Sequence, residues 1–166
     1  MGIKIIFADV DGVLNTHKTT RSLACCQEIR FVDTRKVLRL REIVERTGAK
    51  IVLSSTWRFG AMPDAFFLER EALRELVAEF QRLRCPLWFD ITPYFARAKR
   101  WQEINGWLMN HDVEDFIILD DVGEELKPFA DKLVLTDPWQ GLTKERAELA
   151  ISMLNKENTN EWHTRN

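Results

Sequence analysis

Near its start the chain reads IKIIFADVDGVL, residues 3–14, an apolar run that ends in two aspartates and a glycine. The run is rich in β-branched residues and has no helical period, so it predicts a buried strand that ends near Asp9. Asp9 and Asp11 could share one face of an extended chain, and Gly12 permits a sharp turn beside them. Two crowded carboxylates repel each other unless a cation or a shared proton lies between them. Mg²⁺ is the expected cation because it prefers oxygen ligands.

The composition is typical of an ordinary globular protein. The 166 residues are 45% hydrophobic and 30% charged, which predicts one folded domain with a substantial core. We expect this domain to cover residues 1–156, with a flexible polar tail at 157–166. The net charge is −2, so no overall field draws the chain to nucleic acid or to a membrane. The apolar runs are too short to span a bilayer and no signal peptide precedes the first strand, so we expect a cytoplasmic protein.

The three cysteines, Cys25, Cys26 and Cys85, form neither a disulfide framework nor a zinc-binding pattern. His17, His111 and His163 are scattered along the chain, so a nucleophilic Cys-His site could arise only by accident of folding. We expect the cysteines to be structural or incidental.

Helices alternate with further apolar strands along the chain. A helix is predicted over Asp33–Gly48, with Asp33 or Thr34 as its N-cap and Gly48 as its stop. An apolar strand follows at residues 50–53, and strand, helix and apolar strand in this order are typical of a parallel sheet. Further strands are expected over 85–91, 116–119 and 133–136, and further helices from Pro63 to about Arg84, from Arg97 to Asn110, and up to Leu154.

Polar residues follow two more of these strands. Ser54 and Ser55 come after the strand at 50–53, and Asp120 and Asp121 come after the strand at 116–119. The carboxyl ends of parallel strands meet at one edge of the sheet, which is where open α/β sheets bind ligands. We therefore expect both pairs to lie close to Asp9 and Asp11.

This order of motifs resembles the haloacid dehalogenase-like (HAD) superfamily, most of whose members are magnesium-dependent phosphatases. Residues 51–58, IVLSSTWR, are similar as a block to the HAD domain of Swiss-army-knife RNA repair proteins. The resemblance extends from Ile3 to about Leu154. It implies an α/β fold, a three-layer Rossmann-like arrangement with a central parallel sheet and a small or absent cap, because residues 15–30 are too few for a large one. Residues 59–96 exceed what a bare crossover needs, which leaves room for a small lid.

The resemblance also implies roles for individual residues. Asp9 corresponds to the nucleophile and Asp11 to the general acid/base. A hydroxyl from Ser54 or Ser55 would hold the substrate phosphate, and the position of the strand end does not decide between the two. Trp57 and Arg58 could line the substrate entrance, and Trp57 could equally lie in the core.

A basic residue at the start of the helix predicted from Arg97 should neutralise charge on the phosphate. Lys99 matches the commoner lysine of the superfamily, whereas Arg100 better resembles the related branch. Both oppose the helix dipole at this end, so another interaction must compensate. The magnesium ligands implied by the resemblance are Asp9, the backbone carbonyl of Asp11, and Asp120 or Asp121.

The expected activity is therefore magnesium-dependent hydrolysis of phosphomonoesters through an aspartyl phosphate. The partner is a phosphorylated substrate, for which a nucleotide or a nucleic-acid end is a candidate because an uncapped site admits bulky molecules. The alternatives are a small-metabolite or sugar phosphatase of the same superfamily and a non-catalytic binding module with the HAD fold. The presence of both Asp9 and Asp11 favours an enzyme.

Overall fold

Five parallel strands form one sheet in the order β3-β2-β1-β4-β5. The computed structural model describes residues 2–17, 19 and 32–156. The strands are β1 (Ile3–Ala8), β2 (Lys50–Leu53), β3 (Asp90–Ile91), β4 (Val113–Asp120) and β5 (Leu133–Leu135). The order places β1 at the centre, because the chain crosses to one side of it through β2 and β3 and then to the other side through β4 and β5.

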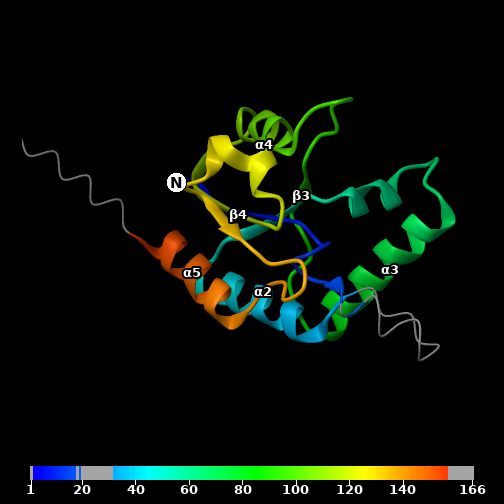
Figure 1. The fold of residues 1–166 in the computed structure, drawn as a ribbon, viewed down its shortest axis with the longest axis horizontal. Helices are drawn as coiled ribbons and strands as arrows, with labels where there is room; N and C mark the ends of the chain where they lie inside the picture. Colours follow the sequence, from blue (N-terminus) through cyan, green and yellow to red (C-terminus); the bar gives the residue numbers. More distant parts are fainter. Residues whose placement is uncertain (1, 18, 20–31, 157–166) are drawn as a thin grey trace, which may run out of the picture.

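Helices cover both faces of this sheet, as Figure 1 shows. One face carries α2 (Thr34–Thr47), α3 (Phe67–Arg82) and α5 (Lys144–Asn155), and the other carries α4 (Arg100–Leu108) and the 3₁₀ segment η2 (Gly123–Phe129). A second 3₁₀ segment, η1 (Thr56–Ala61), follows β2. The three-layer α/β arrangement predicted from the sequence is confirmed.

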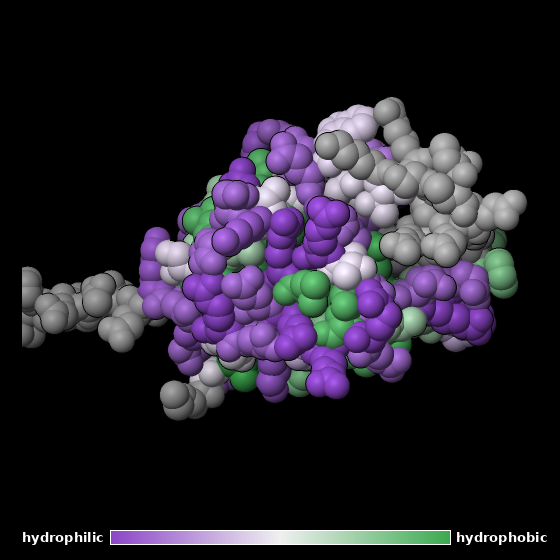
Figure 2. All heavy atoms as spheres, turned by 90° about the horizontal axis from the view of Figure 1, so that it is seen from below, coloured by the Kyte–Doolittle hydropathy of each residue, from purple (hydrophilic) through white to green (hydrophobic). Residues whose placement is uncertain are grey.

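The alternation of side chains along β1 explains the two layers. Ile6 and Ala8 are buried against the cluster that includes α2 and α5, whereas Ile5 and Phe7 are buried against α4 and η2. A strand segment that is buried on both faces must be apolar, which is why residues 5–8 show neither a helical nor an alternating pattern. The outer side of α2 and α5 is mostly hydrophilic (Figure 2).

The caps of α2 act as predicted. The Asp33 carboxylate accepts a hydrogen bond from the backbone N–H of Arg35 at 2.8 Å. Gly48 has a φ of 70° and donates its N–H to the carbonyl of Val44. A residue with a Cβ rarely adopts this left-handed conformation, so the glycine ends the helix.

The predicted helix starts at Pro63 and Arg97 were wrong. The first of these helices, α3, begins at Phe67, where the Glu69 carboxylate accepts a hydrogen bond from the N–H of Phe66 at 2.9 Å. Its Leu76 and Phe80 lie in the core beside α2, so this part of the segment 59–96 belongs to the helical layer. The other helix, α4, begins only at Arg100, because Arg97 has a φ of 64° that no helix accommodates.

The strand predicted over 85–91 is also shorter than expected. Only Asp90 and Ile91 pair with β2, and the preceding residues approach the sheet as irregular chain. Cys85 is buried, and burial raises the pKa of its thiol to about 12, which suits a structural rather than a reactive cysteine.

Some of the sequence predictions concern residues that lie wholly or mostly outside the described ones. These are the predictions for Cys25 and Cys26, for the loop and small cap within residues 15–30, and for the tail at 157–166. In the described part of the chain, none of the helices combines the length and the apolar character needed to cross a bilayer.

Candidate active site

The strand register brings three of the sequence motifs to one edge of the sheet. Ala8, the last residue of β1, pairs with Leu53 of β2 on one side and with Leu119 of β4 on the other. The residues that follow, Asp9, Ser54 and Asp120, therefore start at the same level at the carboxyl end of the sheet. Asp9 and Ser54 are held there by backbone hydrogen bonds to the neighbouring strands, at 3.0 and 2.9 Å.

Three carboxylates converge at this edge. One oxygen from each of Asp9, Asp120 and Asp121 lies within 4.8 Å of the other two. Asp121 can approach because Gly12 has no side chain: a Cβ there would overlap the Asp121 carboxylate, and the φ of 70° at Gly12 is itself unfavourable for other residues. Of the first acidic motif, Asp9 therefore lies close to both aspartates of the last one.

The electrostatics of the three carboxylates call for a nearby positive charge. Burial raises the pKa of Asp120 to about 7, against the opposing effect of the Arg100 charge. Burial also raises the pKa of Asp9, opposed by Arg100 and by the Ser55 hydroxyl, and raises the pKa of Asp121. The ionised forms are thus less favourable in the protein alone than in water, because desolvation costs more than the charge of Arg100 returns.

This carboxylate cluster fits a divalent cation. Its donors are all oxygens, as hard ions such as Mg²⁺ prefer. In addition, Asp120 Oδ2 is buried and accepts no hydrogen bond from any residue that the structure describes. Its neighbour Arg100 Nε, at 3.4 Å, forms an ion pair with it but no hydrogen bond, and a cation between the three carboxylates would complete its coordination.

Arg100 is the basic residue that the structure brings to this cluster. Its Nη2 lies 3.4 Å from Asp9 Oδ2 and its Nε lies 3.4 Å from Asp120 Oδ2. A third nitrogen, Nη1, donates a hydrogen bond to the carbonyl of Ser54. These contacts explain how a cation is tolerated in the first turn of α4, where the helix dipole disfavours it. Lys99 is exposed and precedes the helix, so the structure does not bring it into the cluster.

The Asp11 carboxylate is held apart from the three others. Its Oδ1 accepts a hydrogen bond from Asn15 Nδ2 at 2.7 Å, and its Oδ2 accepts one from Trp57 Nε1 at 3.0 Å. Asn15 also accepts a hydrogen bond from the N–H of Gly12 at 3.2 Å, which ties the turn together. Sequence reasoning missed Asn15, although an asparagine four residues after an aspartate in a glycine turn is a recognisable turn signal.

Both serines after β2 are buried at the carboxyl edge of the sheet. Ser54 Oγ is buried and makes no hydrogen bond to any described residue. Ser55 Oγ accepts a hydrogen bond from the N–H of Trp57 at 3.4 Å and lowers the pKa of Asp9. The two hydroxyls therefore stay alternative candidates for binding an anionic ligand.

A buried ion pair between Arg58 of η1 and Glu103 of α4 lies next to the site. Arg58 Nη2 lies 2.8 Å from Glu103 Oε2, and the two side chains are only 4% and 8% exposed. Arg58 Nη1 also donates a hydrogen bond to the carbonyl of Ser55 at 2.8 Å. The pair joins the segment after β2 to α4, three residues from Arg100. Sequence reasoning missed it, since nothing in the sequence links these two distant charges.

Comparison with known proteins adds one finding. No curated protein gives a significant match to this chain. The family model for the HAD domain in Swiss Army Knife RNA repair proteins matches residues 5–147. This match covers most of the chain and includes every candidate site residue discussed above. Because the fold, the site and this match agree, the chain belongs to the HAD family, in the branch described as the HAD domain of Swiss Army Knife RNA repair proteins.

Proposed function

We propose that this protein is a magnesium-dependent phosphomonoester hydrolase that acts through an aspartyl phosphate formed on Asp9. The observation that carries the proposal is the cluster of Asp9, Asp120 and Asp121 at the carboxyl edge of the sheet, with Arg100 in contact with two of its members. Membership of the HAD family supports the same reaction class.

The carboxylates of Asp9, Asp120 and Asp121 would hold the ion, and the backbone carbonyl of Asp11 is the further ligand implied by the family. Bound Mg²⁺ supplies positive charge that lets an anionic nucleophile meet an anionic phosphate. Arg100 adds a fixed charge at the same place, because its guanidinium is already oriented by Asp9, Asp120 and the Ser54 carbonyl. An oriented charge needs little reorganisation as the reaction proceeds.

In the proposed mechanism an oxygen of Asp9 attacks phosphorus, and the bond from phosphorus to the leaving oxygen breaks. Asp11 donates a proton to that leaving oxygen. In the second half, Asp11 takes a proton from the water that attacks the phosphorus of the aspartyl phosphate, which regenerates Asp9. The hydrogen bonds from Asn15 and Trp57 would keep the Asp11 side chain available beside Asp9 rather than within the carboxylate cluster.

The substrates proposed are nucleotides or nucleic acids with a terminal phosphate. The support is the description of the matching family, whose proteins act in RNA repair. A hydroxyl of Ser54 or Ser55 would bind a phosphate oxygen, and the unpaired state of Ser54 Oγ supports a polar ligand there.

The test measures hydrolysis of an aryl phosphate with Mg²⁺, with excess chelator, and in the variant Asp9→Asn. We expect turnover to require the metal and to fall by roughly a factor of 10⁴ or more in Asp9→Asn, since the amide cannot act as a nucleophile. Asp131→Asn is the matched control, because Asp131 is exposed and lies outside the site. Acid quenching of the wild type should trap a phosphorylated protein. Turnover that survives in chelator, or in a folded Asp9→Asn variant, would refute the proposal.

A further inference from the structure

Two arginines hold consecutive carbonyl groups after β2. Arg100 Nη1 donates a hydrogen bond to the carbonyl of Ser54, and Arg58 Nη1 donates one to the carbonyl of Ser55 at 2.8 Å. Because each peptide unit is planar, two fixed carbonyls also fix the orientation of Ser55 between them. The two arginines therefore control the segment that carries both candidate phosphate-binding hydroxyls.

Glu103 joins Arg58 to the helix that carries Arg100. Its Oε2 lies 2.8 Å from Arg58 Nη2, and its Oε1 accepts a hydrogen bond from the N–H of Phe95 at 3.4 Å. Glu103 lies three residues after Arg100 on α4, so the two residues are about one helical turn apart. A shift of Glu103 would therefore move the start of α4, and Arg100 with it.

The charge of Glu103 acts on both arginines. Burial lowers the pKa of Arg58, the charge of Glu103 opposes this effect, and the charge of Arg100 adds to it. Burial acts on Arg100 in the same direction, but the charges of Asp9, Asp120 and Glu103 raise its pKa. Glu103 therefore reduces the repulsion between two guanidinium groups that bind adjacent carbonyls.

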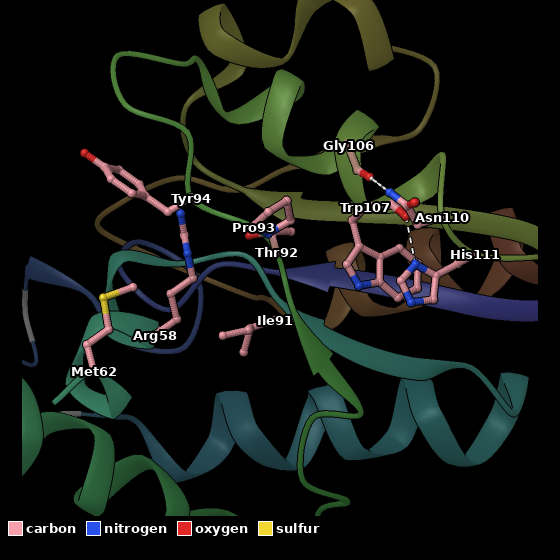
Figure 3. A pocket seen from close by; sticks show the side chains of 10 residues that line it. All are labelled: Arg58, Met62, Ile91, Thr92, Pro93, Tyr94, Gly106, Trp107, Asn110 and His111. Atoms are coloured by element: carbon pink, nitrogen blue, oxygen red, sulfur yellow. Dashed lines mark hydrogen bonds between the residues drawn. The ribbon is translucent and has the colours of Figure 1, made fainter.

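The guanidinium of Arg58 offers little to a ligand. Figure 3 shows Arg58 at one end of a hollow of about 320 Å³ beside α4, and the lining of this hollow is mostly apolar. The Arg58 side chain is only 4% exposed and its Nε is buried, so a molecule in the hollow finds almost none of the guanidinium to bind. The role of this charge must lie in its contacts with Ser55 and Glu103.

Stability alone does not explain why this pair is charged. An apolar pair of similar volume is often at least as stable as a buried ion pair, because it avoids the desolvation of two charges. Arg58 Nε adds a further cost, since it makes no hydrogen bond to any residue that the structure describes. Such unfavourable arrangements are expected mainly at functional sites, and this one adjoins the carboxylate cluster through Arg100.

We propose that Arg58 and Glu103 are positioning residues for the hydrolytic reaction. Arg58 acts through the backbone of residues 54–55, Glu103 acts through Arg100, and neither touches the substrate. The inference rests on the proposed function, because it assigns the two residues to that reaction. Fixed charges and donors act mainly on the charge that develops in the transition state. Their displacement should therefore lower kcat and leave KM nearly unchanged.

The first test replaces Arg58 by lysine. Arg58→Lys keeps a positive charge beside Glu103, but one ammonium group cannot reproduce the planar fork that also reaches Ser55. We expect the Tm to stay within a few degrees of the wild type, kcat for an aryl phosphate to fall about tenfold, and KM to change less than about twofold. Arg41→Lys, in the more exposed pair with Glu45 on α2, is the matched control.

Inhibitors give a second measurement on the same variant. Orthovanadate imitates the trigonal transition state of phosphoryl transfer, whereas inorganic phosphate imitates the product. In Arg58→Lys, inhibition by orthovanadate should weaken by about the same factor as kcat, and inhibition by phosphate should change little. A residue that only stabilises the fold would alter neither inhibition constant.

The third measurement separates positioning from stability. The double variant Arg58→Met, Glu103→Leu should retain much of the stability. Its kcat should nevertheless fall by about 10- to 100-fold, because the Ser55 carbonyl and α4 lose the groups that hold them. Arg41→Met, Glu45→Leu removes the same two charges from α2 and should leave kcat unchanged.

The outcomes separate this inference from the proposed function. Wild-type kcat in folded Arg58→Lys or in the folded double variant would overturn the positioning role and leave the phosphatase proposal intact. A rise in KM without a fall in kcat would overturn it as well, and Arg58→Lys decides alone if the double variant does not fold. A wild-type protein that hydrolyses no phosphomonoester would refute the proposed function, and the positioning role with it.

Discussion

Replacing Glu103 by glutamine should destabilise the protein far more than removal of an exposed charge. Glu103 is 8% exposed and neutralises Arg58, which is 4% exposed, across 2.8 Å. Burial already lowers the pKa of Arg58, which the charge of Glu103 opposes. In Glu103→Gln the neutral amide can still accept a hydrogen bond, but the buried guanidinium loses its counter-charge.

The expected magnitude follows from the burial of the pair. Removing one partner of a buried ion pair costs about 3–5 kcal/mol, and the retained hydrogen bonds favour the lower value, about 3 kcal/mol. For a chain of this size, each kcal/mol lowers the Tm by about 2–4 °C, so the Tm should fall by about 6–12 °C. The matched control is Glu45→Gln, which breaks the 2.7 Å pair between Arg41 and Glu45 at 34% and 55% exposure. That change should cost less than about 1 kcal/mol.

Calorimetry and urea unfolding of the two variants provide the assay. The double variant Arg58→Met, Glu103→Leu should recover much of the lost stability, because an apolar pair avoids the desolvation of two charges. Glu103 lies on α4 three residues after Arg100, so Glu103→Gln should also lower kcat if α4 shifts. Equal changes in Tm for Glu103→Gln and Glu45→Gln would refute the reasoning, since they would mean that burial adds nothing to the pair.

Three further results are expected. Asp11→Asn should slow hydrolysis of alkyl phosphates more than that of nitrophenyl phosphate, whose leaving group needs no proton; equal slowing when chemistry is rate-limiting would exclude Asp11 as the acid. Gly12→Ala should weaken Mg²⁺ binding, measured by calorimetry, because a Cβ there displaces Asp121; unchanged affinity would show that Asp121 is not a ligand. The raised pKa of Asp120, about 7, means that the metal-free fold binds this proton more tightly than the unfolded chain. The associated stability is present at low pH and is lost as pH rises towards and through 7. Since Mg²⁺ favours the ionised form, it should raise the Tm more at pH 8 than at pH 5, and an equal rise at both would contradict this account.

The main features of the fold were predictable because they depend on local patterns. The apolar runs of β1, β2 and β4 identify buried parallel strands, and the Asp33 and Gly48 caps mark the limits of α2. The helix starts were less predictable because they depend on single conformations. A left-handed Arg97 has no sequence signature, yet it delays α4 until Arg100.

The candidate site was predictable only where a residue adjoins a strand end. Asp9 and Asp120 follow paired residues of β1 and β4, so the topology alone brings them together. The choice between Lys99 and Arg100 needed the rotation of α4, which the sequence does not specify. The contacts of Arg58 with Glu103 and of Asn15 with Asp11 depend on the paths of turns, which local propensity does not determine.

The lengths of the strands also affect how the molecule behaves at high concentration. The inner strands β1 and β4 have six and eight residues, whereas the outermost strands of the described sheet, β3 and β5, have two and three. A second chain that approached either side would find too few free backbone groups to add a stable strand. The native sheet therefore offers a poor template for intermolecular β-pairing. Aggregation should instead begin with partial unfolding that exposes the apolar edges of β1 or β4.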